Sequence, residues 1–180
     1  MTKPLAPERK RTARQAGNSS VRFLIALAGA AIFVWLSSRA LPDLVASHFG
    51  TTGSANGFMP RLDYRRLMLL LVIGMPLIMA YLPGFGLNRP AARINLPNRE
   101  YWLAPPRRAE TVRILRAGMR RFATLLLIFL SYAHWLVVQA NQHQPPSLSM
   151  PWFMGGLLLC TLAMLAVAWQ LITRFRSIPE

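Results

Sequence analysis

Four long apolar runs are the feature that most constrains how this chain can fold. They occupy residues 23–36, 67–82, 122–140 and 152–172, and charged side chains are confined to the segments around them. A helix of about 20 apolar residues crosses the hydrocarbon core of a bilayer, and each run reaches about that length together with its flanks. The pattern therefore predicts an all-α, polytopic integral membrane protein with four transmembrane helices.

The distribution of charge favours a membrane protein over a nucleic-acid-binding protein. The 180 residues include 21 Lys and Arg against 6 Asp and Glu, a formal net charge of +15. The basic residues flank the apolar runs and are absent from them, as in proteins whose Lys and Arg orient membrane spans. A nucleic-acid-binding domain would spread them over one folded face, usually with stacking aromatic residues. We therefore expect a lipid bilayer with anionic headgroups as a partner, and no nucleic acid.

Counting Lys and Arg also predicts the orientation. Residues 1–22 carry six, residues 88–121 carry nine and the C-terminal end carries two. The opposite side carries four: Arg39, Arg61, Arg65 and Arg66. Because Lys and Arg are retained on the cytoplasmic side during insertion, both termini should be cytoplasmic. The predicted location is the bacterial inner membrane, with several passes. A cleavable signal peptide is the alternative for the first run, with small residues near 38–40 in cleavage positions; we favour an uncleaved helix.

The segments between the runs define the predicted organisation. Residues 1–19 should form a disordered basic cytoplasmic tail, and 20–83 a helix–loop–helix membrane domain. A Gly-, Ser- and Thr-rich loop at 41–66 should join its two helices. Pro76 should kink the second helix, and Pro83-Gly84 should end it. Residues 84–121 should form a basic cytoplasmic or interfacial segment, in which a helix starting at Pro105-Pro106 runs into the hairpin of spans at 122–174.

His134 is the sharpest single candidate for a functional side chain. It lies inside the third run, with Val138 and Asn141 following on the same helical face. An ionisable group at that depth faces the helix bundle or a water-filled cavity. It is interpreted either as a proton-responsive or ligand-contacting group, or as a neutral imidazole hydrogen-bonded between helices.

The sequence offers no catalytic or metal-binding pattern. His48, Asp43 and Asp63 share the outer loop, but their irregular spacing matches no zinc motif. Glu100 and Glu110 lie among arginines, which favours charge pairing over acid–base catalysis. We therefore predict a protein that is not an enzyme, with no catalytic residue, no metal and no cofactor.

Short motifs in the polar segments resemble a known family. The stretch LPDLVASHFG at 41–50, NG at 56–57 and PR at 60–61, between two apolar runs, is similar to the domain of unknown function 1648. The downstream NLPN at 95–98, YWLAP at 101–105, HW at 134–135 and AN at 140–141 resemble a four-helix subgroup of such proteins. The domain occurs in bacterial Sdp-type immunity and signalling proteins, which protect cells against a secreted peptide toxin. The resemblance implies architecture more than mechanism.

Two functions follow as expectations. The first is an interaction or immunity protein that senses a peptide or a membrane-protein partner through the outer loop. The second is a small transporter or an accessory subunit of a membrane complex, in which Pro76 and His134 line a path and a homo-oligomer supplies the missing helices. The candidate ligand- or partner-binding residues are His48, Asn56, Arg61, Asn95, Asn98, Tyr101, Trp102, His134 and Asn141. For residues 95–102 two interpretations stay open, a cap that seats an interfacial turn and a cytoplasmic docking surface.

Overall fold

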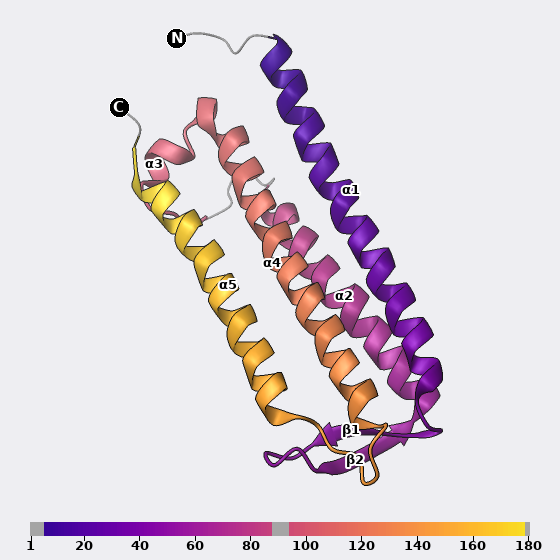
Figure 1. Ribbon diagram of the computed structural model, residues 1–180. Coiled ribbons are helices and arrows are strands. Elements are labelled where there is room, and N and C mark those ends of the chain that lie inside the picture. Colours follow the sequence, from indigo (N-terminus) through magenta and orange to yellow (C-terminus); the bar gives the residue numbers. More distant parts are fainter. Residues whose placement is uncertain (1–5, 88–93, 179–180) are drawn as a thin grey trace.

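The computed structural model describes residues 6–87 and 94–178, and the side chains of residues 19–83 and 94–178. Most of the chain is helical, and a short β-hairpin lies at one end of the helices (Figure 1). The elements in chain order are α1 (Ala6–Ser37), a 3-10 turn (Ser38–Ala40), β1 (Leu44–Phe49), β2 (Ala55–Pro60), α2 (Arg61–Leu87), α3 (Arg99–Trp102), α4 (Pro105–Ala140) and α5 (Met150–Arg176).

The prediction of four membrane-length helices is confirmed for the described residues. The segments long and apolar enough to cross a membrane are Ser19–Ala40, Arg61–Pro83, Pro105–Ala140 and Met150–Arg176. Each contains one of the apolar runs. The helix predicted to start at Pro105-Pro106 also continues into the third span without interruption, as α4. Proline at the first position of a helix suits this start, because its missing N–H would have had no intrahelical partner.

The loop predicted at residues 41–66 is wrong over most of its length, and the fold is therefore not purely α-helical. β1 and β2 pair in antiparallel register, with Leu44 opposite Pro60 and Ala46 opposite Phe58. Gly53 takes a positive φ of 87° in the connection between them. The physical reason is that backbone N–H and C=O groups in a Gly-rich segment still need partners, and here the segment supplies them to itself.

Two predicted boundaries of the second span are also corrected. α2 starts at Arg61 and continues through Pro76 and Pro83 to Leu87, so Pro83-Gly84 does not end it. The Arg61 N–H lies outside the helical ladder and donates to the Asp43 carbonyl at 2.8 Å. Asp63 lies in the first turn, where a carboxylate is favoured by the positive end of the helix dipole.

The backbone of the predicted disordered tail differs from expectation as well. α1 begins at Ala6, so residues 6–19 continue the first span as helix. Ala, Arg, Lys and Gln dominate this stretch, and all four favour helix once a neighbouring turn is already formed.

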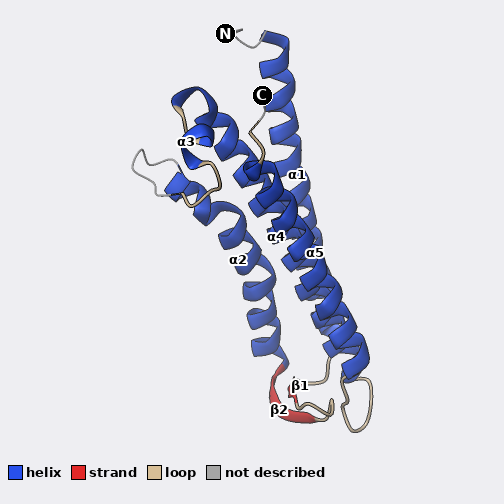
Figure 2. Cartoon of the chain, turned by 90° about the vertical axis from the view of Figure 1, so that its left-hand side faces the viewer, coloured by secondary structure: helices blue, strands red, loops and turns tan. Residues whose placement is uncertain are grey.

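α4 lies at the centre of the molecule. It packs against α1, α2 and α5, and α1 also packs against α2 (Figures 1 and 2). The main apolar core is shared by α1, α2 and α4 and contains Phe23, Leu27, Val34, Val72, Ala80, Ala123 and Leu127. We call the end that carries β1 and β2 the hairpin end. The opposite end, which carries α3, the first turns of α1 and the last turns of α5, is the basic end.

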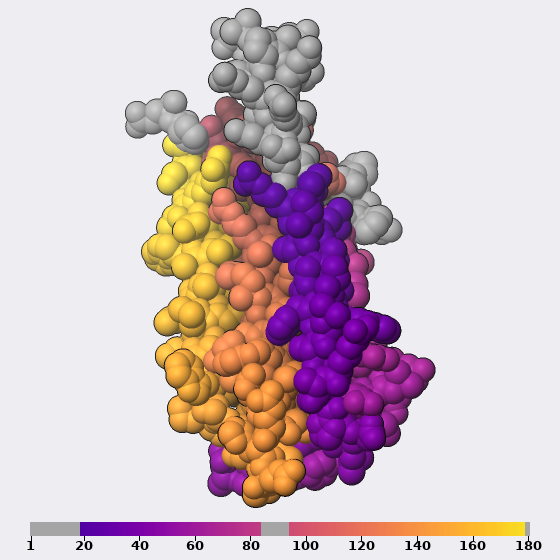
Figure 3. All heavy atoms as spheres, turned by 45° about the vertical axis from the view of Figure 1, so that its right-hand side comes forward, coloured from indigo at the N-terminus to yellow at the C-terminus, as the bar shows by residue number. Residues whose placement is uncertain are grey.

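α5 lies outside this core. It lies along α4, and the face seen in Figure 3 has α4 between α1 and α5. Its outward leucines are among the most exposed apolar side chains, with Leu158 at 61% and Leu159 at 71%. An apolar face of this kind on a helix of membrane length is what lipid contact requires.

Candidate functional site

His134 joins three helices at a fully buried position. Its Nε2 lies 2.8 Å from the Ser37 Oγ at the end of α1, and its Nδ1 lies 2.9 Å from the Tyr64 hydroxyl in the first turns of α2. The Tyr64 ring also stacks on the imidazole, at 5.7 Å between centroids, and the Phe33 ring meets it edge-on at 5.8 Å. Both ring nitrogens therefore have hydroxyl partners inside the bundle.

This arrangement suits a neutral imidazole. A neutral histidine donates from one nitrogen and accepts at the other, and each hydroxyl can take the complementary role. Of the two interpretations of His134, the geometry supports the imidazole bonded between helices. Sequence reasoning missed Ser37 and Tyr64, because a contact between three separate helices leaves no spacing signal in the chain.

Asn141 fixes the hairpin to the end of α4. Its Oδ1 accepts from the Ala46 N–H at 2.8 Å, and its Nδ2 donates to the Ala46 carbonyl at 2.9 Å. The same amide group also donates to the Val137 carbonyl at 2.9 Å, one turn back in α4. Since Val45 and Ala46 are completely buried, this amide satisfies a backbone unit that solvent cannot reach.

Arg61 closes the base of the hairpin. Its Nη2 lies 2.8 Å from the Asp43 carboxylate, and its Nη1 donates to the Leu41 carbonyl at 2.9 Å. The ion pair is well exposed and contributes little by itself. Together with the backbone bond from Arg61 to Asp43, it links the residues just before β1 to the first residue of α2.

The far side of the hairpin is open. The His48 Nδ1 and the Asn56 Oδ1 form a hydrogen bond across the two strands, and both side chains are exposed. Leu44 is 61% exposed and Phe58 is 52% exposed. The structure thus brings His48 and Asn56 together, as two members of an exposed surface that also offers large apolar side chains. We call Leu44, His48, Asn56 and Phe58 the hairpin face.

The tip of the hairpin is anchored to the α4–α5 connection. The Leu148 N–H donates to the Gly53 carbonyl at 2.8 Å, and Ser54 and Ser147 form an isolated antiparallel bridge. Leu148 is buried with Leu136 and Ala140 in a small core of its own. These contacts place the turn against the rest of the protein, so the hairpin is supported at its base, its middle and its tip.

The basic end holds a second group of predicted residues. The Asn98 Nδ2 donates to the carbonyls of Phe175, at 3.3 Å, and Arg176, at 2.8 Å. The Trp102 Nε1 donates to the same Phe175 carbonyl at 2.9 Å, and the Phe175 ring packs edge-on against the indole. These carbonyls end α5 and lack helical donors, so the two side chains act as its C-terminal cap. The geometry supports the capping interpretation for Asn98 and Trp102.

Tyr101 and Asn95 are placed differently. The Arg107 guanidinium lies over the Tyr101 ring at 3.9 Å from its centroid, which gives a cation–π contact on the surface of the basic end. Asn95 is exposed and makes no hydrogen bond to another described residue. The docking-surface interpretation of residues 95–102 stays open, since Asn95, Arg99 and Glu100 are exposed and Tyr101 is half-buried.

No group of three His, Cys, Asp or Glu side chains gathers as metal ligands would in the described part of the chain. Comparison with protein-family models, curated proteins and solved structures gives no match. The resemblance to the domain of unknown function 1648 therefore stays a prediction.

Proposed function

We propose that this chain is a non-enzymatic protein of the bacterial inner membrane that binds a peptide or a membrane-protein partner through its hairpin face. The predicted orientation, with both termini in the cytoplasm, places that face on the outer side of the membrane. The observation that carries the proposal is the combination of rigid attachment and open surface. The hairpin is bonded to the bundle through Asn141, Arg61 and Gly53, while Leu44 and Phe58 stay exposed.

Rigid attachment matters because ordering a flexible loop on binding costs free energy. A flexible loop of 26 residues, as the sequence predicted for 41–66, would incur the whole of this ordering cost when a partner binds. A hairpin whose backbone is already paired and anchored does not, so more of the contact energy is available for affinity.

The strand edges suggest how a peptide is recognised. The Ala46 N–H and C=O are taken by Asn141, so the Ala46–Phe58 pair is not a hydrogen-bonded pair of the ladder. In antiparallel pairing the backbone groups of Phe58 then face the outer edge of β2. An extended peptide can add to such an edge through main-chain hydrogen bonds, while alternate side chains meet the exposed apolar groups.

The experiment compares survival of cells with and without the protein during exposure to secreted, membrane-active peptides. We expect expression to raise survival, and Phe58→Asp and His48→Ala to remove the gain. Thr52→Asp is the matched control, since it adds the same charge to the exposed turn without altering the hairpin face. Equal survival with and without the protein, at matched membrane levels, contradicts the proposal.

The transporter or accessory-subunit alternative rests on Pro76 and His134, and the geometry gives it less support. α2 passes through Pro76 as a continuous helix, and both nitrogens of His134 are occupied by hydroxyls. It stays a prediction, which proton or solute flux in reconstituted liposomes tests directly: flux that depends on His134 would favour it.

A further inference from the structure

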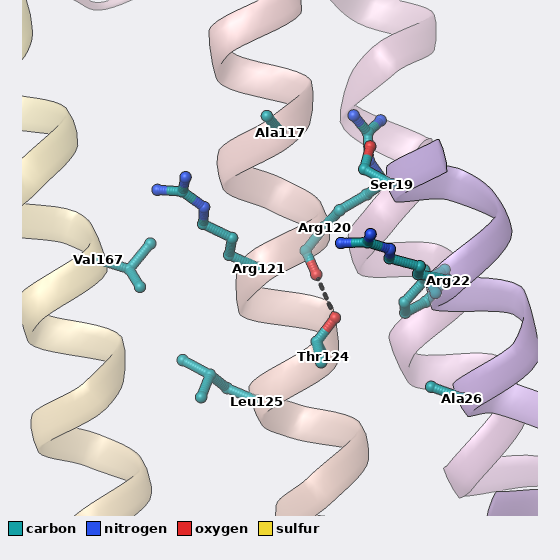
Figure 4. Close-up of a pocket in the computed structure, with 10 residues that line it drawn as sticks. Ser19, Arg22, Ala26, Ala117, Arg120, Arg121, Thr124, Leu125 and Val167 are labelled. Carbon is teal, nitrogen blue, oxygen red and sulfur yellow. Dashed lines mark hydrogen bonds between the residues drawn. The ribbon is translucent and has the colours of Figure 1, made fainter. Parts of the chain in front are cut away.

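A basic cleft opens between α1, α4 and α5 toward the basic end. Its volume is about 780 Å³, and three arginines line it: Arg22 from α1, and Arg120 and Arg121 from α4. Figure 4 shows Arg22 and Arg120 in the space between α1 and α4, with Arg121 on the side of α4 that faces Val167 of α5. Clefts of this volume are the usual size of small-molecule sites.

The cleft lacks a counter-charge within the described side chains. None of its three arginines forms an ion pair there, and Glu110 on α4 pairs instead with Arg113 and Arg174. The Arg120 Nε is moreover buried with no hydrogen-bond partner among those residues. A buried donor without a partner is costly, and an anion in the cleft would supply one.

The depth of the cleft matches the edge of the hydrocarbon core. Arg121 lies 19 residues before Ala140, the last residue of α4, which at 1.5 Å per residue is about 29 Å from the hairpin end. Val167 lies 17 residues after Met150, the first of α5, or about 26 Å by the same rise. Since the hydrocarbon core is about 30 Å thick, the guanidinium groups lie near headgroup level.

Most of the other residues that line the cleft are apolar, with Ser19 and Thr124 as the exceptions. On α1, Phe23 and Ala26 line the cleft nearer the hairpin end than Arg22. On α4, Leu125 lies nearer that end than Arg120 and Arg121. Val167 lines the cleft from α5, on the side that Arg121 faces. A free inorganic anion would use only the arginines, whereas a phospholipid would also cover these apolar side chains. The composition of the walls therefore favours a lipid.

We propose that this cleft binds one anionic phospholipid, with its phosphate held by Arg22, Arg120 and Arg121 and its acyl chains against Phe23, Ala26 and Leu125. Guanidinium groups bind phosphate oxygens through paired, charge-assisted hydrogen bonds. Basic pockets between membrane helices recognise acidic headgroups by the same chemistry. The site is distinct from the hairpin face, at the opposite end of the helices, and the proposal does not depend on a partner binding there.

The test is native mass spectrometry of the full chain in mild detergent, titrated separately with phosphatidylglycerol and phosphatidylcholine. We expect one phosphatidylglycerol per chain, bound at least about fivefold more tightly than phosphatidylcholine. Arg22→Gln with Arg120→Gln should weaken phosphatidylglycerol binding at least about tenfold. The matched control, Arg99→Gln with Arg113→Gln, removes two charges from the same end outside the cleft and should change binding less than about twofold.

A second variant separates the lipid from free phosphate. Ala26→Phe narrows the apolar part of the cleft without changing charge, so it should weaken lipid binding at least about threefold. Millimolar inorganic phosphate should not displace the lipid. Equal binding of both lipids, equal losses in the test and control pairs, or displacement by phosphate would each overturn the proposal. If the double variant does not fold, as judged by circular dichroism, Arg22→Gln alone and Ala26→Phe decide the question.

Discussion

His134, Asn141 and Asn98 each bind an element other than the helix or turn that carries them. His134 reaches α1 and α2, Asn141 reaches β1, and Asn98 reaches the end of α5. His134 is fully buried within a candidate span, where polar groups must find partners inside the protein because water is excluded. Such side chains therefore act as specific links between elements, in places where lipid contact alone would let apolar surfaces slide.

Replacing His134 tests the first of these links. His134→Leu introduces an apolar side chain of similar size and leaves the Tyr64 hydroxyl without its partner, which should cost about 1–3 kcal/mol. Thermal unfolding in detergent should show a midpoint several degrees lower. The neighbouring Trp135→Leu, which changes an exposed side chain, should have a smaller effect.

A double-variant cycle then shows whether the loss comes from the hydrogen bond. Tyr64→Phe should cost less in the His134→Leu background than in the natural chain, because the shared bond is already gone. Fully additive effects, or an unchanged midpoint for His134→Leu, would mean that the imidazole does not link the helices.

Asn98 and Asn95 form a natural pair for testing the cap of α5. Asn98→Ala removes the donor to the Phe175 and Arg176 carbonyls and places Ala at a φ of 49°, which favours Asn or Gly. Hydrogen exchange should speed up over residues 172–177. Asn95→Ala should leave this exchange unchanged, and equal exchange in both variants would rule out the cap.

The sequence predicted the importance of several polar residues better than their roles. Trp102 and Asn98 stood out as part of a cluster that orientation in the membrane does not require, and Asn141 because it follows His134 on one helical face. Their partners, however, are backbone carbonyls and amides of distant segments, which carry no side-chain signature. The same limit hid Ser37 and Tyr64, whose link to His134 exists only once three helices are packed together.

At the scale of elements, the β-hairpin depends on its turn. Gly53 has a φ of 87°, and a Cβ there would collide with the Leu148 backbone. Gly53→Ala should therefore destabilise the hairpin by about 1–2 kcal/mol from the left-handed backbone alone. Faster hydrogen exchange over residues 44–60 is the measurement.

Gly29 on α1 is the matched control for that substitution. A Cβ there meets nothing within 4 Å, and Ala favours helix over Gly by about 0.5–1 kcal/mol. Gly29→Ala should leave hairpin exchange unchanged. A similar response of the hairpin to both variants would contradict the role assigned to the turn.

The helices were predictable from sequence because the bilayer demands a minimum length of apolar residues, and four runs met it. The hairpin was not, because burial does not alternate cleanly along β1. A break of register between Ala46 and His48 also disrupts the period of two that identifies strands. Gly, Ser and Thr in the segment then resembled an open loop.

At the scale of the whole molecule, the distribution of Lys and Arg predicts which end faces the cytoplasm. In a Cys160→Ala background, a Thr52→Cys variant on the hairpin should react with a membrane-impermeant maleimide. The reaction is run on cells whose outer membrane has been removed and whose inner membrane is intact. A cysteine at Glu100 on α3 should react only after the membrane is opened. Both positions are exposed, so accessibility within the protein is matched. The reverse pattern would invert the predicted topology.

The central position of α4 has a consequence for the order in which the protein is made. The ribosome makes α1 and α2 first, yet the imidazole that joins Ser37 to Tyr64 lies in α4, and the amide that holds β1 belongs to Asn141, the residue after α4. During translation the first two of the predicted spans therefore lack these contacts until α4 is made. Synthesis of α4 supplies the missing partners, and α5 follows last.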